Sequence, residues 1–103
     1  MRSKDDIEKE DSLQPLKVNL QAITDERGAE YGDFTHQGII AQDLKEYMRE
    51  QDGWKRLKSH QKESLDMIMH KVSRILNGNP ENRDSWVDIA GYAQISAERI
   101  LDR

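Results

Sequence analysis

Apolar residues recur along this chain at the three- and four-residue spacing of amphipathic helices, and no stretch alternates at the two-residue spacing of a strand. Four segments show the helical spacing. They predict helices near residues 14–30, 34–50, 60–77 and 82–102. The pattern therefore predicts an all-α fold, a small four-helix architecture without a sheet.

The two C-terminal segments have the most continuous apolar stripes. The first consists of Leu65, Ile68, Met69, Val72, Ile75 and Leu76, and the second of Trp86, Ile89, Ala90, Ala93, Ala97, Ile100 and Leu101. Gly78 is expected to end the first helix in the left-handed conformation, and Asn79-Pro80 prevents its continuation. A short turn between two long helices predicts an antiparallel hairpin.

The N-terminal half is expected to hold the other two helices. Residues 1–11 contain eight charged residues and are predicted to be a mobile charged tail before one helical domain, residues 12–103. Tyr31-Gly32-Asp33 is expected to break the chain between the first two helices. Gly32 can take an unusual backbone angle there, and either Asp33 or Thr35 can cap the next helix.

Composition restricts the classes of partner. The 103 residues include 16 Lys and Arg, 20 Asp and Glu, and no cysteine, so the net charge is −4. An acidic chain has no general attraction to nucleic acid or to an anionic membrane, so neither is an expected partner. The lack of cysteine excludes disulfides and thiolate zinc sites. No apolar run reaches membrane-spanning length, and the N-terminus does not look like a signal peptide, so a cytoplasmic location is expected.

Three polar motifs lie on this helical pattern. They are Tyr31-Gly32-Asp33, Lys71-x-x-Arg74, and the run D-S-W-V-D-I-A-G-Y-A at residues 84–93. Together they resemble a group of small phage and prophage proteins of unassigned function, over most of the chain after the tail. The last motif also resembles, more loosely, phage domains associated with nucleotide modification. The resemblance implies a phage-type protein of the bacterial cytoplasm that handles nucleotides.

A weaker resemblance is to the all-α, MazG-like nucleoside triphosphate pyrophosphohydrolases. Those enzymes hold magnesium with an E-x-x-E motif on one helix and an E-x-x-D motif on the next. The nearest matches here are Glu63 with Asp66, and Asp84 with Asp88, the second pair being one residue further apart. The resemblance implies that these four residues bind Mg²⁺. Carboxylates at such spacings share a helix face and supply the oxygen ligands that Mg²⁺ prefers.

Five further residues are candidates for binding a nucleotide. Lys71 and Arg74 share a helix face and can bind phosphate oxygens. Tyr92 can stack on a base or hydrogen-bond to it, and the turn at Tyr31 and Asp33 can close over a ligand. The expected ligand is a (deoxy)nucleoside triphosphate with Mg²⁺, which would neutralise the phosphates and orient an attacking water. No catalytic residue is assigned, and binding without hydrolysis stays open.

A structural interpretation of the acidic residues competes with the metal site. In an antiparallel hairpin, Asp66 lies roughly 9 Å along the axis beyond the level of Asp88. The two acidic pairs then do not meet at one ion unless the helix ends early or a second subunit supplies a pair. The same register places the second pair beside Arg74 and Lys71. It predicts ion pairs between the helices, with Asp88 at least partly buried.

A second function class therefore remains open, that of a non-enzymatic helical accessory protein acting on a phage or host partner. The apolar stripes are wide for four helices. Tyr47, Met48 and Trp54 are expected to leave apolar surface that one chain does not cover. A two-fold homodimer would cover such a surface on both copies.

Overall fold

The computed structural model describes residues 14–100, which form four α-helices, one 3₁₀ helix and no strand. The elements are α2 (Gln14–Tyr31), α3 (Phe34–Glu50), η1 (Asp52–Arg56), α4 (Ser59–Asn77) and α5 (Arg83–Glu98). The predicted all-α, four-helix class is confirmed, and each helix begins within one residue of its predicted start. The predicted tail, residues 1–11, lies outside the described residues. Across 14–100, no helix combines the length and hydropathy needed to span a membrane.

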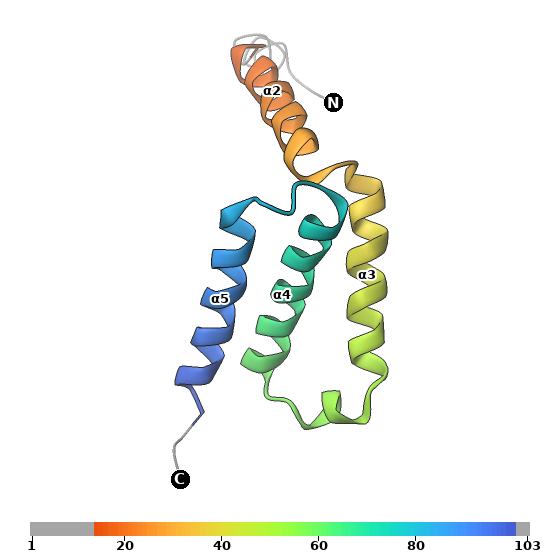
Figure 1. The fold of residues 1–103 in the computed structure, drawn as a ribbon, viewed down its shortest axis with the longest axis vertical. Coiled ribbons are helices and arrows are strands. Elements are labelled where there is room, and N and C mark those ends of the chain that lie inside the picture. The colour runs from red at the N-terminus through yellow and green to blue at the C-terminus, as the bar shows by residue number, and fades with distance from the viewer. Residues whose placement is uncertain (1–13, 101–103) are drawn as a thin grey trace, which may run out of the picture.

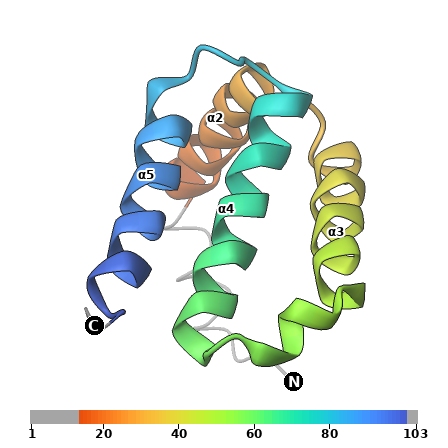
Figure 2. The same ribbon diagram turned by 60° about the horizontal axis from the view of Figure 1, so that its bottom comes forward.

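Three of the helices lie side by side in one layer, with α4 between α3 and α5 (Figure 1). Neighbours in the layer run antiparallel because the connections through η1 and through residues 78–82 are short. The predicted C-terminal hairpin is thus the pair α4–α5. Helix α2 projects from one end of the layer and meets α3 and α4 near its own C-terminal end (Figures 1 and 2).

Small polar side chains mark the contacts of α4 with its neighbours. On the α3 side, Ser73 is fully buried and Gln37 Nε2 donates to its hydroxyl at 3.2 Å. On the α5 side, the hydroxyls of Ser64 and Ser96 hydrogen-bond at 2.7 Å. Among residues 20–100, Ala41 is the single buried apolar residue. The layer therefore packs closely at serines and leaves most larger apolar side chains half-buried or exposed.

The predicted core stripe of α5 is wrong for this reason. Trp86 is 54% exposed, and its indole N–H donates to the carbonyl of Pro80 at 2.8 Å. The alanines of that stripe are exposed as well. Ile89 is the exception, since it lies on the more buried side of α5 with Ser85, Tyr92 and Ser96, and Leu101 lies outside the described residues. Because the small serines allow close approach, they decide which face of α5 packs on α4.

The helix starts follow local hydrogen bonds. The Asp33 carboxylate accepts from the backbone N–H of His36 at 3.1 Å, so the predicted cap of α3 is confirmed. Helix α4 begins at Ser59, and Lys58 is its N-cap residue. The side chain of Gln61 accepts from the backbone N–H of Lys58 at 2.8 Å, which satisfies one of the free donors at this end.

Candidate functional site

The Tyr31-Gly32-Asp33 turn, which leads from α2 into α3, is held by the last residue of α4. Gly32 has φ of +78°, in the left-handed region that favours glycine. Asn77 Nδ2 donates to the carbonyl of Tyr31 at 2.7 Å and to the carbonyl of Asp33 at 2.9 Å. One side-chain amide therefore fixes the backbone on both sides of Gly32, where the sequence predicted an unusual backbone angle.

The connection between α4 and α5 packs against the same turn at Gly78. A Cβ on Gly78 would overlap the carbonyl oxygen of Glu30 and the Cα of Tyr31. Its φ is −135°, so the predicted left-handed helix end is wrong, and close approach is what requires glycine. The side-chain amides of Asn79 and Asn82 donate to the Glu30 carboxylate at 3.3 and 3.0 Å. The end of α2 is thereby tied to both later helices.

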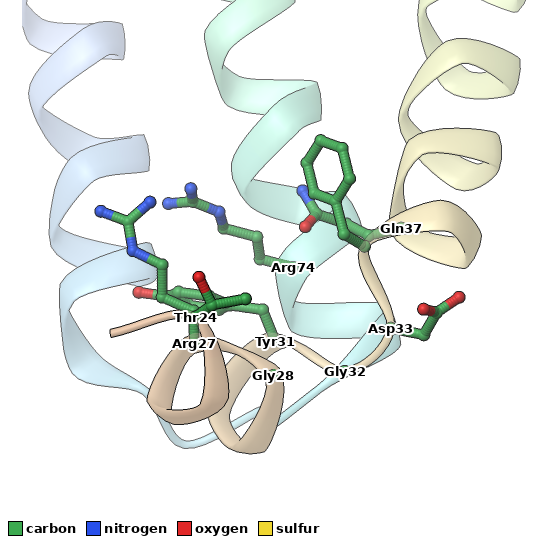
Figure 3. A pocket seen from close by; sticks show the side chains of 9 residues that line it. Thr24, Arg27, Gly28, Tyr31, Gly32, Asp33, Gln37 and Arg74 are labelled. Carbon is green, nitrogen blue, oxygen red and sulfur yellow. The ribbon is translucent and has the colours of Figure 1, made fainter. Parts of the chain in front are cut away.

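A pocket of about 410 Å³ lies where α2, α3 and α4 meet at this turn (Figure 3). Helix α2 contributes Thr24, Arg27, Gly28 and Tyr31, which share one helix face. The turn, α3 and α4 contribute Gly32, Asp33, Phe34, Gln37 and Arg74. The volume lies within the range of about 300–1,000 Å³ that is usual for small-molecule sites.

Arg74 has unmet hydrogen-bonding capacity in this pocket. Its guanidinium carbon lies 4.4 Å from the centre of the Tyr31 ring, which is a cation–π distance. Its Nε is buried and has no hydrogen-bond partner. A buried donor without an acceptor costs about 1–3 kcal/mol. Because protein atoms cover Nε, a ligand in the pocket would meet the terminal nitrogens of the Arg74 guanidinium.

Arg27 enters the same pocket from α2. Figure 3 shows the guanidinium groups of Arg27 and Arg74 on one side of the pocket, pointing toward each other. Within residues 20–100 the ion pairs are those of Arg49 and Lys71, so no carboxylate of this range neutralises either pocket arginine. Two positive groups directed at one space repel each other, and an anion between them removes that repulsion.

Gln37 presents an acceptor to the pocket. Its Nε2 donates to Ser73 Oγ, and the Ser73 hydroxyl donates in turn to the carbonyl of His70. Because that hydroxyl hydrogen is already used, Ser73 must accept from Gln37, and this sets the orientation of the amide. Gln37 Oε1 has no hydrogen bond to another residue of the described chain. It is therefore available to a ligand that carries an N–H or O–H group.

His70 lies one helical turn before Arg74 on α4. Burial lowers the pKa of His70 below its usual value of 6.5, and the charges of Arg74, Lys45 and Lys71 lower this pKa further. The imidazole is therefore neutral at pH 7 and adds no positive charge next to the pocket arginine.

The four predicted magnesium ligands do not come together in one chain. Glu63 and Asp84 are exposed, and Asp66 pairs with Arg49 of α3 at 3.4 Å. In the part of the chain that the structure covers, no three His, Cys, Asp or Glu side chains gather as they must to hold a metal ion. These residues therefore do not fit a magnesium site within a single chain.

Asp88, the fourth of them, pairs with Lys71 at 3.0 Å, which confirms the predicted ion pair between α4 and α5. The Lys71 side chain is only 13% exposed, whereas that of Asp88 is 45% exposed. Asp88 is half-buried, as predicted. Its other predicted partner, Arg74, lines the pocket instead.

The predicted nucleotide-binding residues fall in two places. Tyr31, Asp33 and Arg74 line the pocket, although the carboxylate of Asp33 turns away to cap α3 (Figure 3). Lys71 is occupied by its ion pair, and Tyr92 lies at a separate shallow hollow on α5.

Sequence reasoning missed several pocket residues, above all Arg27 and Gln37. The spacing of Thr24, Arg27 and Tyr31 along one face of α2 was a signal that could have identified Arg27. The sequence holds no comparable signal for Gln37, because the turn at Gly32 is what brings the start of α3, and Gln37 with it, to the pocket.

Comparison with known protein families agrees with the extent of this domain. A family model described as Domain of unknown function (DUF6378) matches residues 14–100. Searches of curated proteins and of solved structures gave no match. Since the family model spans all four helices and the pocket between them, the chain belongs to the DUF6378 family of domains of unknown function.

Proposed function

We propose that this protein binds a nucleotide through its phosphate groups in the pocket at the Tyr31-Gly32-Asp33 turn. The observation that supports this most directly is the pair Arg27 and Arg74, which reach one space from different helices without a neutralising carboxylate from residues 20–100. Guanidinium groups bind phosphate oxygens through paired, charge-assisted hydrogen bonds. Arg74 lines the pocket, and its terminal guanidinium nitrogens are the donors that a phosphate there would meet.

Other pocket residues suit the remainder of a nucleotide. Phe34 is 76% exposed, so its ring is available to stack on a base. Stacking of a base on an aromatic ring contributes about 1–3 kcal/mol. Gln37 Oε1 can accept a hydrogen bond from an amino or imino group of the base. The pocket thus offers phosphate donors on one side and base contacts on the other.

The ligand class that fits the resemblance is a (deoxy)nucleoside triphosphate, which brings Mg²⁺ on its own phosphates. We assign the acidic residues of the chain no role toward that ion, because those in the described range do not gather into a site. Hydrolysis in the manner of MazG-like enzymes would require ligands from a second chain. The proposal is therefore one of binding, with phage origin and a cytoplasmic location as its expected setting.

A second candidate is a non-enzymatic interaction protein, and the exposed apolar residues favour it. Among residues 20–100, ten large apolar side chains are at least 44% exposed, and they occur on all four helices and at Ile100 just after α5. Extended apolar surface marks protein interfaces. Of the residues predicted to form such a surface, Tyr47 is exposed, whereas Met48 and Trp54 are half-buried. We propose that a second copy of the chain covers part of this surface, which makes the protein a homodimer.

A thermal-shift screen tests nucleotide binding. The full chain is heated with phosphate, pyrophosphate, nucleosides, and ribo- and deoxyribonucleoside mono- and triphosphates, with and without Mg²⁺. A ligand of the folded state raises Tm by mass action. Nucleotides should raise Tm and nucleosides should not, and Arg74→Gln should lose at least about tenfold in affinity, since each 1.4 kcal/mol is a factor of ten.

Arg49→Gln is the matched control, because it also removes a guanidinium group. Arg49 pairs with Asp66 and lies away from the pocket. It should respond like the wild type. If no phosphate-bearing ligand raises Tm, or if Arg74→Gln responds as strongly as the wild type, the proposal is wrong and the interaction protein becomes the better candidate.

A further inference from the structure

Gln37 lies deepest in the pocket at the Tyr31-Gly32-Asp33 turn. It is only 3% exposed, and it is the one buried residue among those that line the pocket. Figure 3 shows its side chain directed from α3 toward α4. Phe34 lies three positions before Gln37, so the two side chains share one face of α3. A base that stacks on the exposed Phe34 ring is therefore placed beside the Gln37 amide.

The amide of Gln37 is held in one orientation by α4. Its Nε2 donates to Ser73 Oγ at 3.2 Å, and Ser73 is completely buried. The Ser73 hydroxyl donates its hydrogen to the carbonyl of His70, so Ser73 Oγ can only accept from Gln37. If the amide turned over, Oε1 would face another acceptor, and the contact with Ser73 would be lost where water cannot replace it. The amide therefore keeps its N–H group toward α4 and Oε1 toward the pocket.

Gln37 Oε1 is the free end of this arrangement. Among residues 20–100, the covered side-chain nitrogen or oxygen without a partner is Arg74 Nε, so the unbonded Oε1 keeps contact with the pocket space. A glutamine amide that is free to turn can present either a donor or an acceptor. With its orientation fixed, Gln37 offers a ligand an acceptor only. A ligand atom that faces Oε1 must therefore be a donor, because two acceptors would leave each other unpaired.

Nucleotide bases differ in the group that they would bring to this oxygen. Adenine and cytosine carry an exocyclic amino group, whereas hypoxanthine and uracil carry a carbonyl oxygen at the same position. The exocyclic group projects beyond the ring, so it is the first part of the base edge to meet a residue there. An amino group would donate a hydrogen bond to Oε1, and a carbonyl oxygen would be repelled by it.

We infer that Gln37, positioned by Ser73, determines the base specificity of the pocket, which takes nucleotides of adenine or cytosine in preference to those of hypoxanthine or uracil. The inference rests on the nucleotide binding proposed above and names the class of base. Gln37 is the residue that contacts the base. Ser73 is a positioning residue, because it lies behind Gln37 and acts only through the orientation of its amide.

Isothermal titration calorimetry of the full chain with ATP, ITP, CTP and UTP, each with Mg²⁺, tests this inference. All four ligands carry the same triphosphate, and the exocyclic amino group of ATP and CTP is replaced by an oxygen in ITP and UTP. The wild type should bind ATP more tightly than ITP, and CTP more tightly than UTP, by at least about tenfold, which corresponds to 1.4 kcal/mol. Equal affinities within each pair, or the opposite preference, would overturn the inference and leave nucleotide binding standing. No binding of any of the four would overturn both.

Two substitutions separate the amide from its orientation. Gln37→Met keeps the length of the side chain and removes the amide, so it should bind ATP and ITP alike. Ser73→Ala frees the amide to turn, so it should still bind ATP but lose most of the preference over ITP. The wild-type preference in either variant would overturn the inference.

Ser64→Ala is the matched control for Ser73→Ala. Ser64 is another buried serine of α4, and its hydroxyl hydrogen-bonds to Ser96 on the α5 side, away from the pocket. This variant should keep the full preference for ATP over ITP even if its Tm falls as far as that of Ser73→Ala. Circular dichroism checks that all three variants keep their helices. An equal loss of preference in both serine variants would show a general effect of destabilisation and overturn the role of Ser73.

Discussion

His70 shows how a single residue can link the charge of this protein to its stability. Burial and the neighbouring cations lower the pKa of His70 in the folded chain, whereas the unfolded chain titrates near 6.5. The unfolded state therefore binds the proton first as pH falls. As far as His70 determines it, the free energy of unfolding keeps its full value above pH 6.5. It decreases as pH falls below 6.5.

The prediction is that the wild type loses free energy of unfolding between pH 7.5 and pH 5.5, and that His70→Gln loses less over the same interval. Urea unfolding at the two pH values measures this difference. An equal loss in both proteins would show that His70 does not contribute in the way its surroundings indicate.

Some residue-scale features could be predicted from the sequence because their cause is local. The Asp33 cap and the break at Gly32 follow from the preferences of single residues at helix ends and turns. The ion pair between Lys71 and Asp88 could be predicted from the register of the α4–α5 hairpin. Arg27 and Gln37 could not be found with the same certainty, because the pocket depends on how α2 meets the layer.

At the scale of elements, the connection between α4 and α5 fixes the position of α2. Gly78→Ala should cost about 1–3 kcal/mol, the usual penalty for overpacking, because its Cβ overlaps the backbone of Glu30 and Tyr31. Urea unfolding at fixed protein concentration measures the change.

Gly38→Ala is the control for this substitution. It has open space for a Cβ in a helix interior and should gain up to about 1 kcal/mol from helix propensity. If Gly78→Ala is as stable as the wild type, the two backbones do not approach as closely as described.

The helices themselves were predictable because each has a clear apolar spacing and a defined start. Their packing faces were less predictable. The α5 stripe centred on Trp86 looked like a core, yet the helix packs through Ser85 and Ser96. Hydrophobic periodicity locates a helix, but small side chains at a contact can override it in choosing the face.

At the scale of the whole molecule, the layer and the projecting α2 create two surfaces with different chemistry. The pocket at the Tyr31-Gly32-Asp33 turn has two arginines that no carboxylate of residues 20–100 pairs with, and the outer side of α5 has exposed apolar side chains. The acidic residues predicted to bind Mg²⁺ do not meet at one site within the described chain. Asp66 and Asp88 instead pair with cations at separate places. We therefore propose that a ligand binds at the junction of the three helices.

Nuclear magnetic resonance of the ¹⁵N-labelled protein tests the ligand site most directly. The protein is titrated with the nucleoside triphosphate that gives the largest thermal shift. Arginine Nε–H groups give their own signals, so the unpartnered Arg74 Nε–H can be followed directly. The account predicts large changes at the Nε–H of Arg27 and Arg74 and at the amides of Gly28 and Gly32, with Gly91 unchanged. A saturable titration that leaves Arg74 unmoved, or that shifts only α5, would contradict it.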